Sequence, residues 1–375
     1  MSGRSLCLAL LAACAATIGA ASAPSPATYS EQDFGKVPKF DAHFHANRYD
    51  RGALATARRD RFELLSINVD YPDFPPLPEQ ATIAERMRAD DRTHFQFTTA
   101  FSMDGFGTSG WSERTIRTID AAVARGAVAV KVWKNIGMVA RDPAGRRVFL
   151  DDPRFDLVMR HLEERHIPLI AHQGEPKNCW LPLDQMTTDN DREYFMEHPE
   201  YYMYLHPNEP SYEQLMAARD RFVARHPRLA FDGAHMASLE WSVDELARFL
   251  DRYPNAVVDL AARMSNLQVQ SNADLAKVRA FFIKYQDRIL YGTDLTDSPP
   301  DPHARAQNPP ATDDFPGQED RVWRADWRYL ATPLGQRVDA IGAEAKGLAL
   351  PRPVIDKIYW TNAHRFFRLT PPAGL

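Results

Sequence analysis

Short apolar runs alternate with amphipathic stretches along most of this 375-residue chain. Some of the runs, such as residues 127–130, are apolar at every position, which is typical of strands buried on both faces of a parallel sheet. We read eight strands, near residues 38–45, 63–70, 95–101, 127–133, 167–173, 229–235, 256–262 and 288–294. Eight strands that are each followed by a helix-like stretch predict an α/β protein with a (β/α)8 TIM-barrel fold.

The stretches between the strands have the periodicity of helices that cover a sheet. They lie at residues 79–89, 111–124, 152–166, 212–225, 242–252 and 272–285. Ser242, with Glu245 three residues later, resembles a capping box, and Ser112 is a candidate cap for the second helix. Two further helices are expected over 319–330 and, closing the chain, over 354–369.

Two connections are long enough to be insertions. Residues 174–210 follow the fifth strand and are polar and aromatic, and residues 296–318 follow the eighth strand and carry six prolines. Either could be a tolerated surface loop. Because loops after barrel strands face the active site, we expect both to shape the binding of a substrate.

The N-terminal residues differ from the rest. Arg4 is the only charge before Glu31, and residues 6–11 are apolar, so residues 1–23 read as a secretory signal peptide. Cleavage after Ala21 or Ala23 fits, whereas a lipobox-like segment ending at Cys14 would make a lipoprotein instead. Residues 24–36 read as a linker, and residues 37–375 as one barrel domain. We expect an exported, periplasmic protein.

Composition and charge exclude some classes of binding partner. The net charge is −5 and no long basic run occurs, which argues against nucleic acid and anionic membrane surfaces. No later apolar stretch is long enough for a transmembrane segment. Once residues 1–23 are removed, Cys179 is the only cysteine left, so we expect no internal disulfide and a buried thiol.

Polar residues stand where the predicted strands end. His43 and His45 are two residues apart on the first strand and so share one face. His172 ends the fifth strand, His235 the sixth and Asp294 the eighth. Each could be structural by itself. Together they point to chemistry, because barrel enzymes place their catalytic groups at the carboxyl ends of the strands.

This ordered set resembles that of the amidohydrolase superfamily, specifically its amidohydrolase-related (amidohydrolase 2) branch. The motifs are H-x-H on strand one, single histidines on strands five and six, Gly-Thr-Asp at 292–294, and the closing segment 362–367. The resemblance runs from about residue 37 to residue 369. It implies a metal-dependent hydrolase, in which a metal-activated water attacks an amide, lactone or ester carbonyl.

The resemblance also implies roles for single residues. It makes His43, His45, His172 and Asp294 the ligands of one divalent metal. Zn²⁺ is the first expectation, and Mn²⁺ or Fe²⁺ are the alternatives. Asp294 would act as general base and then acid, and His235 would polarise the carbonyl or bind a second metal.

Lys131 stands at a place similar to that of a carbamylated lysine that bridges two metals in some relatives. An unmodified lysine that contacts substrate or pairs with a carboxylate is the alternative. Glu175, Trp180 and Arg263 are candidate substrate-binding residues. Trp133 is a further candidate for an aromatic wall, with core packing as its alternative. Arg263 could hold a substrate carboxylate with two parallel hydrogen bonds, or could form a structural ion pair with Asp259 or Glu175.

Two other functions stay open at this point. Relatives in the same branch include metal-dependent, non-oxidative decarboxylases, and a barrel that has lost turnover would be a non-catalytic binding protein. In each case we expect the partner to be a small molecule, with carboxylates among the candidates. A homo-oligomer is expected by analogy alone.

Overall fold

The computed structural model describes residues 28–299 and 314–372. The expected signal peptide at 1–23 therefore lies outside the described residues, and so does most of the proline-rich segment 296–318. Export of the protein stays a prediction. None of the helices within the described ranges is both long and apolar enough to span a bilayer.

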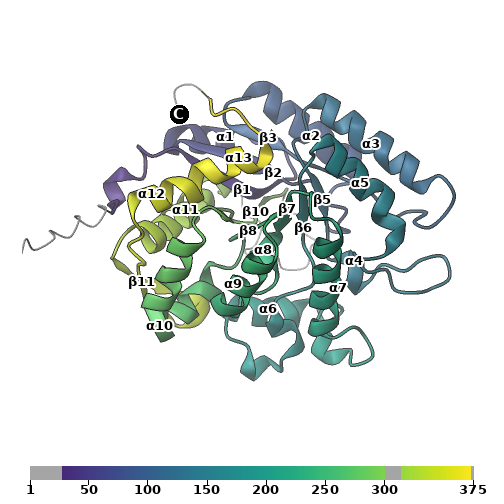
Figure 1. The fold of residues 1–375 in the computed structure, drawn as a ribbon. Helices are drawn as coiled ribbons and strands as arrows, with labels where there is room; N and C mark the ends of the chain where they lie inside the picture. The colour runs from purple at the N-terminus through teal and green to yellow at the C-terminus, as the bar shows by residue number, and fades with distance from the viewer. Residues whose placement is uncertain (1–27, 300–313, 373–375) are drawn as a thin grey trace, which may run out of the picture.

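Parallel strands form the centre of the molecule, and all eight predicted strands are present (Figure 1). They are divided between two sheets, with the orders β10-β1-β2-β3 and β4-β5-β6-β7-β8-β9. Their bounds are β1 (Lys39–Ala46), β2 (Phe62–Ser66), β3 (Phe95–Phe97), β4 (Thr99–Ala100), β5 (Val130–Val132), β6 (Leu169–Ala171), β7 (Phe231–Gly233), β8 (Ala256–Asp259), β9 (Ile289–Leu290) and β10 (Leu295–Asp297).

The two sheets are joined by backbone hydrogen bonds at both junctions. β3 and β4 are two parts of one strand around Thr98, whose N–H donates to Ser66 O at 2.9 Å, while Thr99 N–H donates to Ala129 O at 3.0 Å. β9 and β10 are likewise two parts of the eighth strand, and the intervening Tyr291 O accepts from Ala42 N at 2.9 Å. The strands therefore follow one another around a (β/α)8 barrel.

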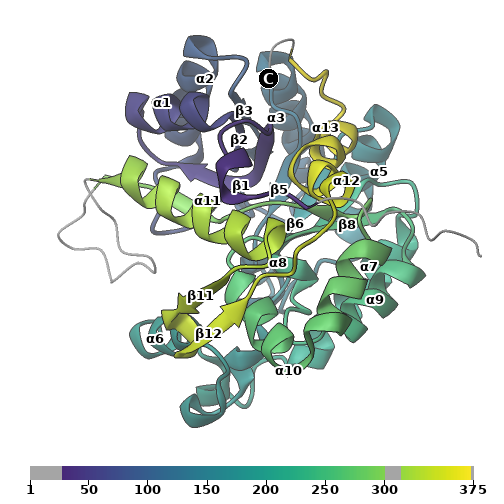
Figure 2. The same cartoon turned by 90° about the vertical axis from the view of Figure 1, so that its left-hand side faces the viewer.

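Helices cover the outside of the strands (Figures 1 and 2). Their bounds are α1 (Arg51–Asp60), α2 (Leu77–Asp90), α3 (Trp111–Arg125), α4 (Asn135–Met138), α5 (Asp156–Arg165), α6 (Asp189–Glu197), α7 (Tyr212–Arg225), α8 (Ala234–Ala237), α9 (Val243–Arg252), α10 (Met264–Lys284), α11 (Phe315–Ala331), α12 (Arg352–Asp356) and α13 (Asn362–Phe367). α1 and α6 were not expected from the sequence, and α10 begins eight residues before the predicted start at 272.

Of the two helix caps that the sequence predicts, the structure has one. Ser242 Oγ accepts from Glu245 N at 3.3 Å, so the predicted cap of α9 is confirmed. The expectation for Ser112 is wrong, because α3 begins after Gly110, which has a φ of 76° and supplies no side-chain cap.

The apolar core lies on both sides of the strands. Along β1, Phe40 and Ala42 belong to the cluster inside the barrel, whereas Phe44 and Ala46 belong to the cluster beneath the helices. α11 is anchored by Trp323, which is fully buried and stacks on Phe62 with 3.9 Å between ring centroids. Burial on both faces is why the strand sequences read as continuous apolar runs.

Residues 28–36, the described part of the expected linker, pack on the barrel domain. Tyr29 Oη donates to Asp356 at 2.7 Å, Trp327 Nε1 donates to Ser30 O at 3.0 Å, and Phe34 is buried. This part of the segment therefore belongs to the folded unit rather than forming a free connection.

The segment between β6 and α7 contains α6 and three 3₁₀ turns, at Lys177–Trp180, Leu183–Gln185 and Met203–Leu205. Figure 2 shows α6 beside the antiparallel hairpin of β11 (Gly335–Val338) and β12 (Ala343–Lys346). Cys179, within the first turn, is buried as expected.

Candidate metal centre and its pocket

A pocket with a cavity volume of about 220 Å³ opens at the carboxyl ends of the strands. It collects nearly all of the site residues that the sequence predicted, namely His43, His45, Lys131, His172, Glu175, His235, Arg263 and Asp294. Trp180 does not line this pocket. Its indole Nε1 donates to Pro210 O at 3.1 Å, and its ring packs on Tyr212.

The first and eighth strands bring two imidazoles and a carboxylate together. Asp294 Oδ1 lies 3.3 Å from His43 Nε2 and 3.1 Å from His45 Nε2. Asp294 N donates to His43 O at 2.7 Å, which fixes the eighth strand against β1 at this point. Asp294 has a φ of 67°, a left-handed conformation that interrupts the strand between β9 and β10.

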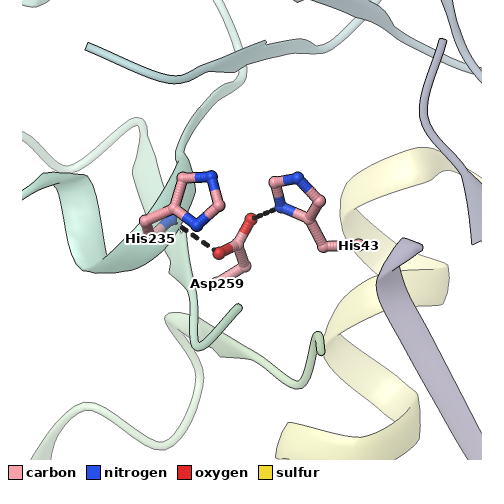
Figure 3. A group of neighbouring side chains, drawn as sticks. All are labelled: His43, His235 and Asp259. Carbon is pink, nitrogen blue, oxygen red and sulfur yellow. Dashed lines mark hydrogen bonds and ion pairs between the residues drawn. The ribbon is translucent and has the colours of Figure 1, made fainter. Parts of the chain in front are cut away.

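Hydrogen bonds on the outer side of the rings set the tautomers of three histidines. His43 Nδ1 lies 2.7 Å from Asp259 Oδ2, as Figure 3 shows, and His45 Nδ1 lies 2.7 Å from Ile67 O. His235 Nδ1 lies 3.0 Å from Ala261 O. Carbonyl and carboxylate oxygens only accept, so each Nδ1 is a donor. In the neutral rings of His43 and His235 the Nε2 therefore keeps its lone pair, while His45 Nε2 lies 3.1 Å from Asp294 Oδ1. This is the arrangement of metal-binding histidines.

His172 and His235 extend the cluster from the other side. The ring centroid of His235 lies 4.2 Å from that of His172 and 4.7 Å from that of His43. His172 Nε2 is buried and has no hydrogen-bond partner. A buried imidazole nitrogen without a partner is unfavourable unless another group, such as a cation, satisfies it.

Burial determines the protonation of the cluster. It lowers the pKa of His43, lowers that of His172 well below its usual value, and lowers that of His235 to about 3. Burial alone would raise the pKa of Asp294, but His235, His45 and His43 together hold it well below its usual value. Neutral imidazoles around an ionised carboxylate are the donor set that a divalent cation requires.

Two groups of ligand atoms within the described residues are close enough to share an ion. One is His43, His45 and Asp294, and the other is His43, His235 and Asp259 (Figure 3), with ligand atoms within 4.8 Å of one another in each. His172 belongs to neither group, although its ring contacts that of His235. The residues present therefore fit a metal, and they offer more donor atoms than one ion needs.

Lys131 lies inside the cluster. Its Nζ is 3.3 Å from His43 Nε2, and its side chain is buried. Burial lowers the pKa of this amine, while the negative charges of Asp259, Asp294 and Asp232 act to raise it. The amine is thus placed to contact a group bound at the histidines.

Glu175 lines the pocket as an ion-pair partner of Lys134. Lys134 Nζ also donates to Tyr194 Oη at 3.0 Å, and its ammonium lies 4.8–5.5 Å from the ring centroids of Trp133, Tyr194 and Tyr201. The cation is therefore held in a cage of aromatic rings, which attract it electrostatically.

These rings are part of a longer aromatic belt that starts beside His45. The ring of Phe74 lies 5.1 Å from that of His45, and each ring of the belt lies 4.5–6.4 Å from the next. In order, the belt consists of Phe74, Tyr71, Trp133, Tyr201, His198, Tyr194 and Phe195. All but Tyr201 line the pocket, so one of its walls is aromatic.

Arg263 lies in the pocket without a close carboxylate. Its Nη1 donates to Ala262 O at 3.1 Å and is 3.9 Å from Asp191, which is a residue of α6. The ion pairs expected with Asp259 or Glu175 are replaced by this long contact. Its Nε is buried and has no hydrogen-bond partner, so the guanidinium has donors to spare.

Sequence reasoning did not identify Asp259 or Lys134 as parts of the site, and of the aromatic belt it offered only Trp133. Asp259 had a detectable signal, because it is the only carboxylate in the apolar run 256–262. The rest of the belt had none, since residues 71–74 and 194–201 come from loops and α6, where no periodicity marks the side chains that face a pocket.

A family model described as amidohydrolase matches residues 40–369, whereas no curated protein matches the chain. The 2,6-dihydroxybenzoate decarboxylase from Rhizobium is similar at 16% identity and a TM-score of 0.49, covering 88% of this chain and 99% of that one. Dihydroorotase from Campylobacter jejuni is similar at 12% identity and a TM-score of 0.47, covering 89% of this chain and 84% of that one. A putative amidohydrolase from Staphylococcus aureus is similar at 10% identity and a TM-score of 0.45, covering 89% of this chain and 99% of that one.

Proposed function

The chain belongs to the amidohydrolase family, and from this premise we propose that it is a metal-dependent hydrolase. Its substrate is a small molecule with an amide, lactone or ester carbonyl. The observation that carries the proposal is the meeting of His43, His45 and Asp294, with His172 and His235 beside them, at the carboxyl ends of the strands.

The ligands that we propose are His43, His45, His172 and Asp294, with Zn²⁺ as the first candidate metal. A bound divalent cation would supply Lewis acidity towards water or a substrate carbonyl. His235 contributes a further donor atom, because its Nδ1–H is used by Ala261 O and its Nε2 faces the cluster as a lone pair. This tautomer supports a ligand role for His235 over hydrogen-bond donation to a carbonyl.

Asp294 is the residue placed to move a proton. Its side chain is 30% exposed and lines the pocket, while His43 and His45 contact one of its two oxygens. We propose that it accepts the proton of the attacking water and returns it to the leaving group, as a general base and then an acid. Lys131, 3.3 Å from His43 Nε2, would donate to substrate oxygen as an unmodified amine.

The test is elemental analysis of the purified protein together with hydrolysis of a panel of amides, lactones and esters. We expect bound metal, and at least a hundredfold loss of hydrolysis in His172→Gln. His364→Gln is the matched control, because His364 is equally buried but pairs with Glu63 outside the pocket. Metal binding without turnover of any substrate would favour a non-catalytic binding protein.

A second candidate is a metal-dependent, non-oxidative decarboxylase, which Arg263 and the aromatic belt favour. Arg263 has a buried Nε without a partner and could bind a carboxylate with two parallel hydrogen bonds. The belt would hold a planar ring beside it. Product analysis separates the candidates: CO₂ released from an aromatic carboxylate indicates decarboxylation, and its absence alongside carbonyl cleavage indicates hydrolysis.

A further inference from the structure

Four consecutive residues that are not glycine adopt the left-handed conformation directly after β7. They are His235, Met236, Ala237 and Ser238, with φ between 55° and 57°. L-residues disfavour this conformation by roughly five- to thirtyfold each, and they usually visit it singly rather than in runs. We call residues 235–238 the left-handed turn.

The left-handed turn folds back tightly over the end of β7. Ser238 N donates to His235 O at 3.1 Å, and Leu239 N donates to Met236 O at 3.0 Å. A Cβ on Gly233 would lie 2.6 Å from the Cβ of Ala237, so only glycine leaves room for this approach. The screw sense of the turn determines the side from which the His235 ring enters the pocket.

Hydrogen bonds between the turn and neighbouring elements hold it at its far end. Ser238 Oγ donates to Gln173 O at 2.8 Å and to Gly174 O at 3.2 Å, the two residues that follow His172. Arg219, which is buried on α7, donates from Nη1 to Ala237 O. Tyr212 Oη donates to Ser238 O at 2.5 Å.

The structure assigns to Ser238 and Arg219 the role of positioning residues that hold the unfavourable left-handed turn, and with it the orientation of His235. Ser238 also ties the turn to the strand end that carries His172. The assignment rests on the proposed function only for the importance of His235, because the conformation of the turn can be measured without turnover.

The test uses imidazole ¹⁵N–¹H spectra of the metal-free full-length protein. His235 signals are assigned by their loss in His235→Gln, and the wild type should show one tautomer with the proton on Nδ1. Ser238→Ala should shift or broaden the His235 signals. Ser238→Gly should disturb them less, because glycine favours the left-handed conformation about five- to thirtyfold more than alanine does.

The order of the two effects, with Ser238→Ala more disruptive than Ser238→Gly, separates this role from an ordinary structural contact. At an ordinary contact, glycine is the more damaging replacement. His166 offers a matched control: it has a φ of 55° at the end of α5 and lies outside the pocket. His166→Gly should unfold at a higher urea concentration than His166→Ala, and neither variant should change the His235 signals.

Arg219→Gln removes the hydrogen bond that α7 makes to the left-handed turn. It replaces Ser238→Ala as the test variant if Ser238→Ala is not folded, as judged by the absence of a cooperative unfolding transition. Unchanged His235 signals in the folded variants, or greater damage from Ser238→Gly than from Ser238→Ala, would overturn the assignment. Failure of the wild type to hydrolyse any substrate would count against the proposed function and leave these spectra unaffected.

Discussion

The pocket has two walls that are built in different ways. The strand-end wall carries His43, His45, His235 and Asp294, whose polar atoms are fixed by backbone and carboxylate partners. The second wall, which starts beside His45, is the aromatic belt, supplied mainly by loops and by the segment between β6 and α7, with one caged ion pair. The comparison suggests that the strands fix the chemistry and the loops select the substrate, as barrel enzymes permit.

Replacing the strand-end carboxylate should have the largest effect. Asp294→Asn removes both a proposed metal ligand and the proposed proton carrier, so we expect kcat to fall by roughly 10³- to 10⁴-fold. Asp191→Asn, in the α6 wall of the same pocket, should lower kcat by less than about tenfold, because its contact with Arg263 is long, at 3.9 Å, and an amide oxygen can still accept from Asn178 and Thr188. Initial rates measure both variants. Equal losses of kcat in Asp294→Asn and Asp191→Asn would contradict the proposal that the strand-end wall carries the chemistry.

Glu175→Gln should cause the next largest effect, on stability rather than on chemistry. It leaves the charge of Lys134 buried without a counter-charge, since the two side chains are 7% and 4% exposed. We expect the free energy of unfolding in urea to fall by about 3–5 kcal/mol. Adding Lys134→Met should restore most of it, and a loss below about 1 kcal/mol would mean that the caged pair is not structural.

Metal removal should act on the strand-end wall alone. A metal present at a hundred times its Kd stabilises the folded protein by about 2.7 kcal/mol, so a chelator should lower Tm by the corresponding amount. The shift should vanish in His45→Gln and persist in Tyr194→Phe, which keeps the ring of the belt. Thermal unfolding with and without added Zn²⁺ checks this. A Tm shift lost in both variants would contradict the prediction that the metal acts on the strand-end wall alone.

The smallest effect is expected in the aromatic belt. Tyr71→Leu removes one ring between Phe74 and Trp133, and should weaken binding of benzoate by about two- to twelvefold, with little change for cyclohexanecarboxylate. Tyr204→Leu is the matched control, because Tyr204 is 51% exposed and lies outside the pocket. Calorimetric titration gives both constants, and equal weakening of the two ligands would remove the case for a planar substrate.

Much of the strand-end wall could be predicted from the sequence. Strand length and burial produce apolar runs, and a histidine or aspartate at the end of such a run is conspicuous because it interrupts them. His43, His45, His172, His235 and Asp294 were all found in this way, and the structure brings them to one pocket. The barrel then explains why residues so distant along the chain meet.

The belt and the left-handed turn could not be predicted, for a physical reason. Tyr71 and Tyr194 lie outside any strand, so their direction depends on loop conformation, which short-range patterns do not encode. The left-handed run at 235–238 contains no glycine, the residue that usually marks such a conformation. Helix α1 was missed because its buried apolar face is short and made mostly of small residues, Ala53, Leu54 and Ala57, between arginines.

The contact between β1 and the eighth strand has a consequence for biogenesis. His45 and Asp294, whose side chains meet there, are separated by 249 positions, so a nascent chain on the ribosome lacks half of this contact until Asp294 has been synthesised. An ion held by both residues could bind only after Asp294 has been made and the eighth strand has paired with β1. Fragments that end before Asp294, however well their first strands pair, would lack this carboxylate.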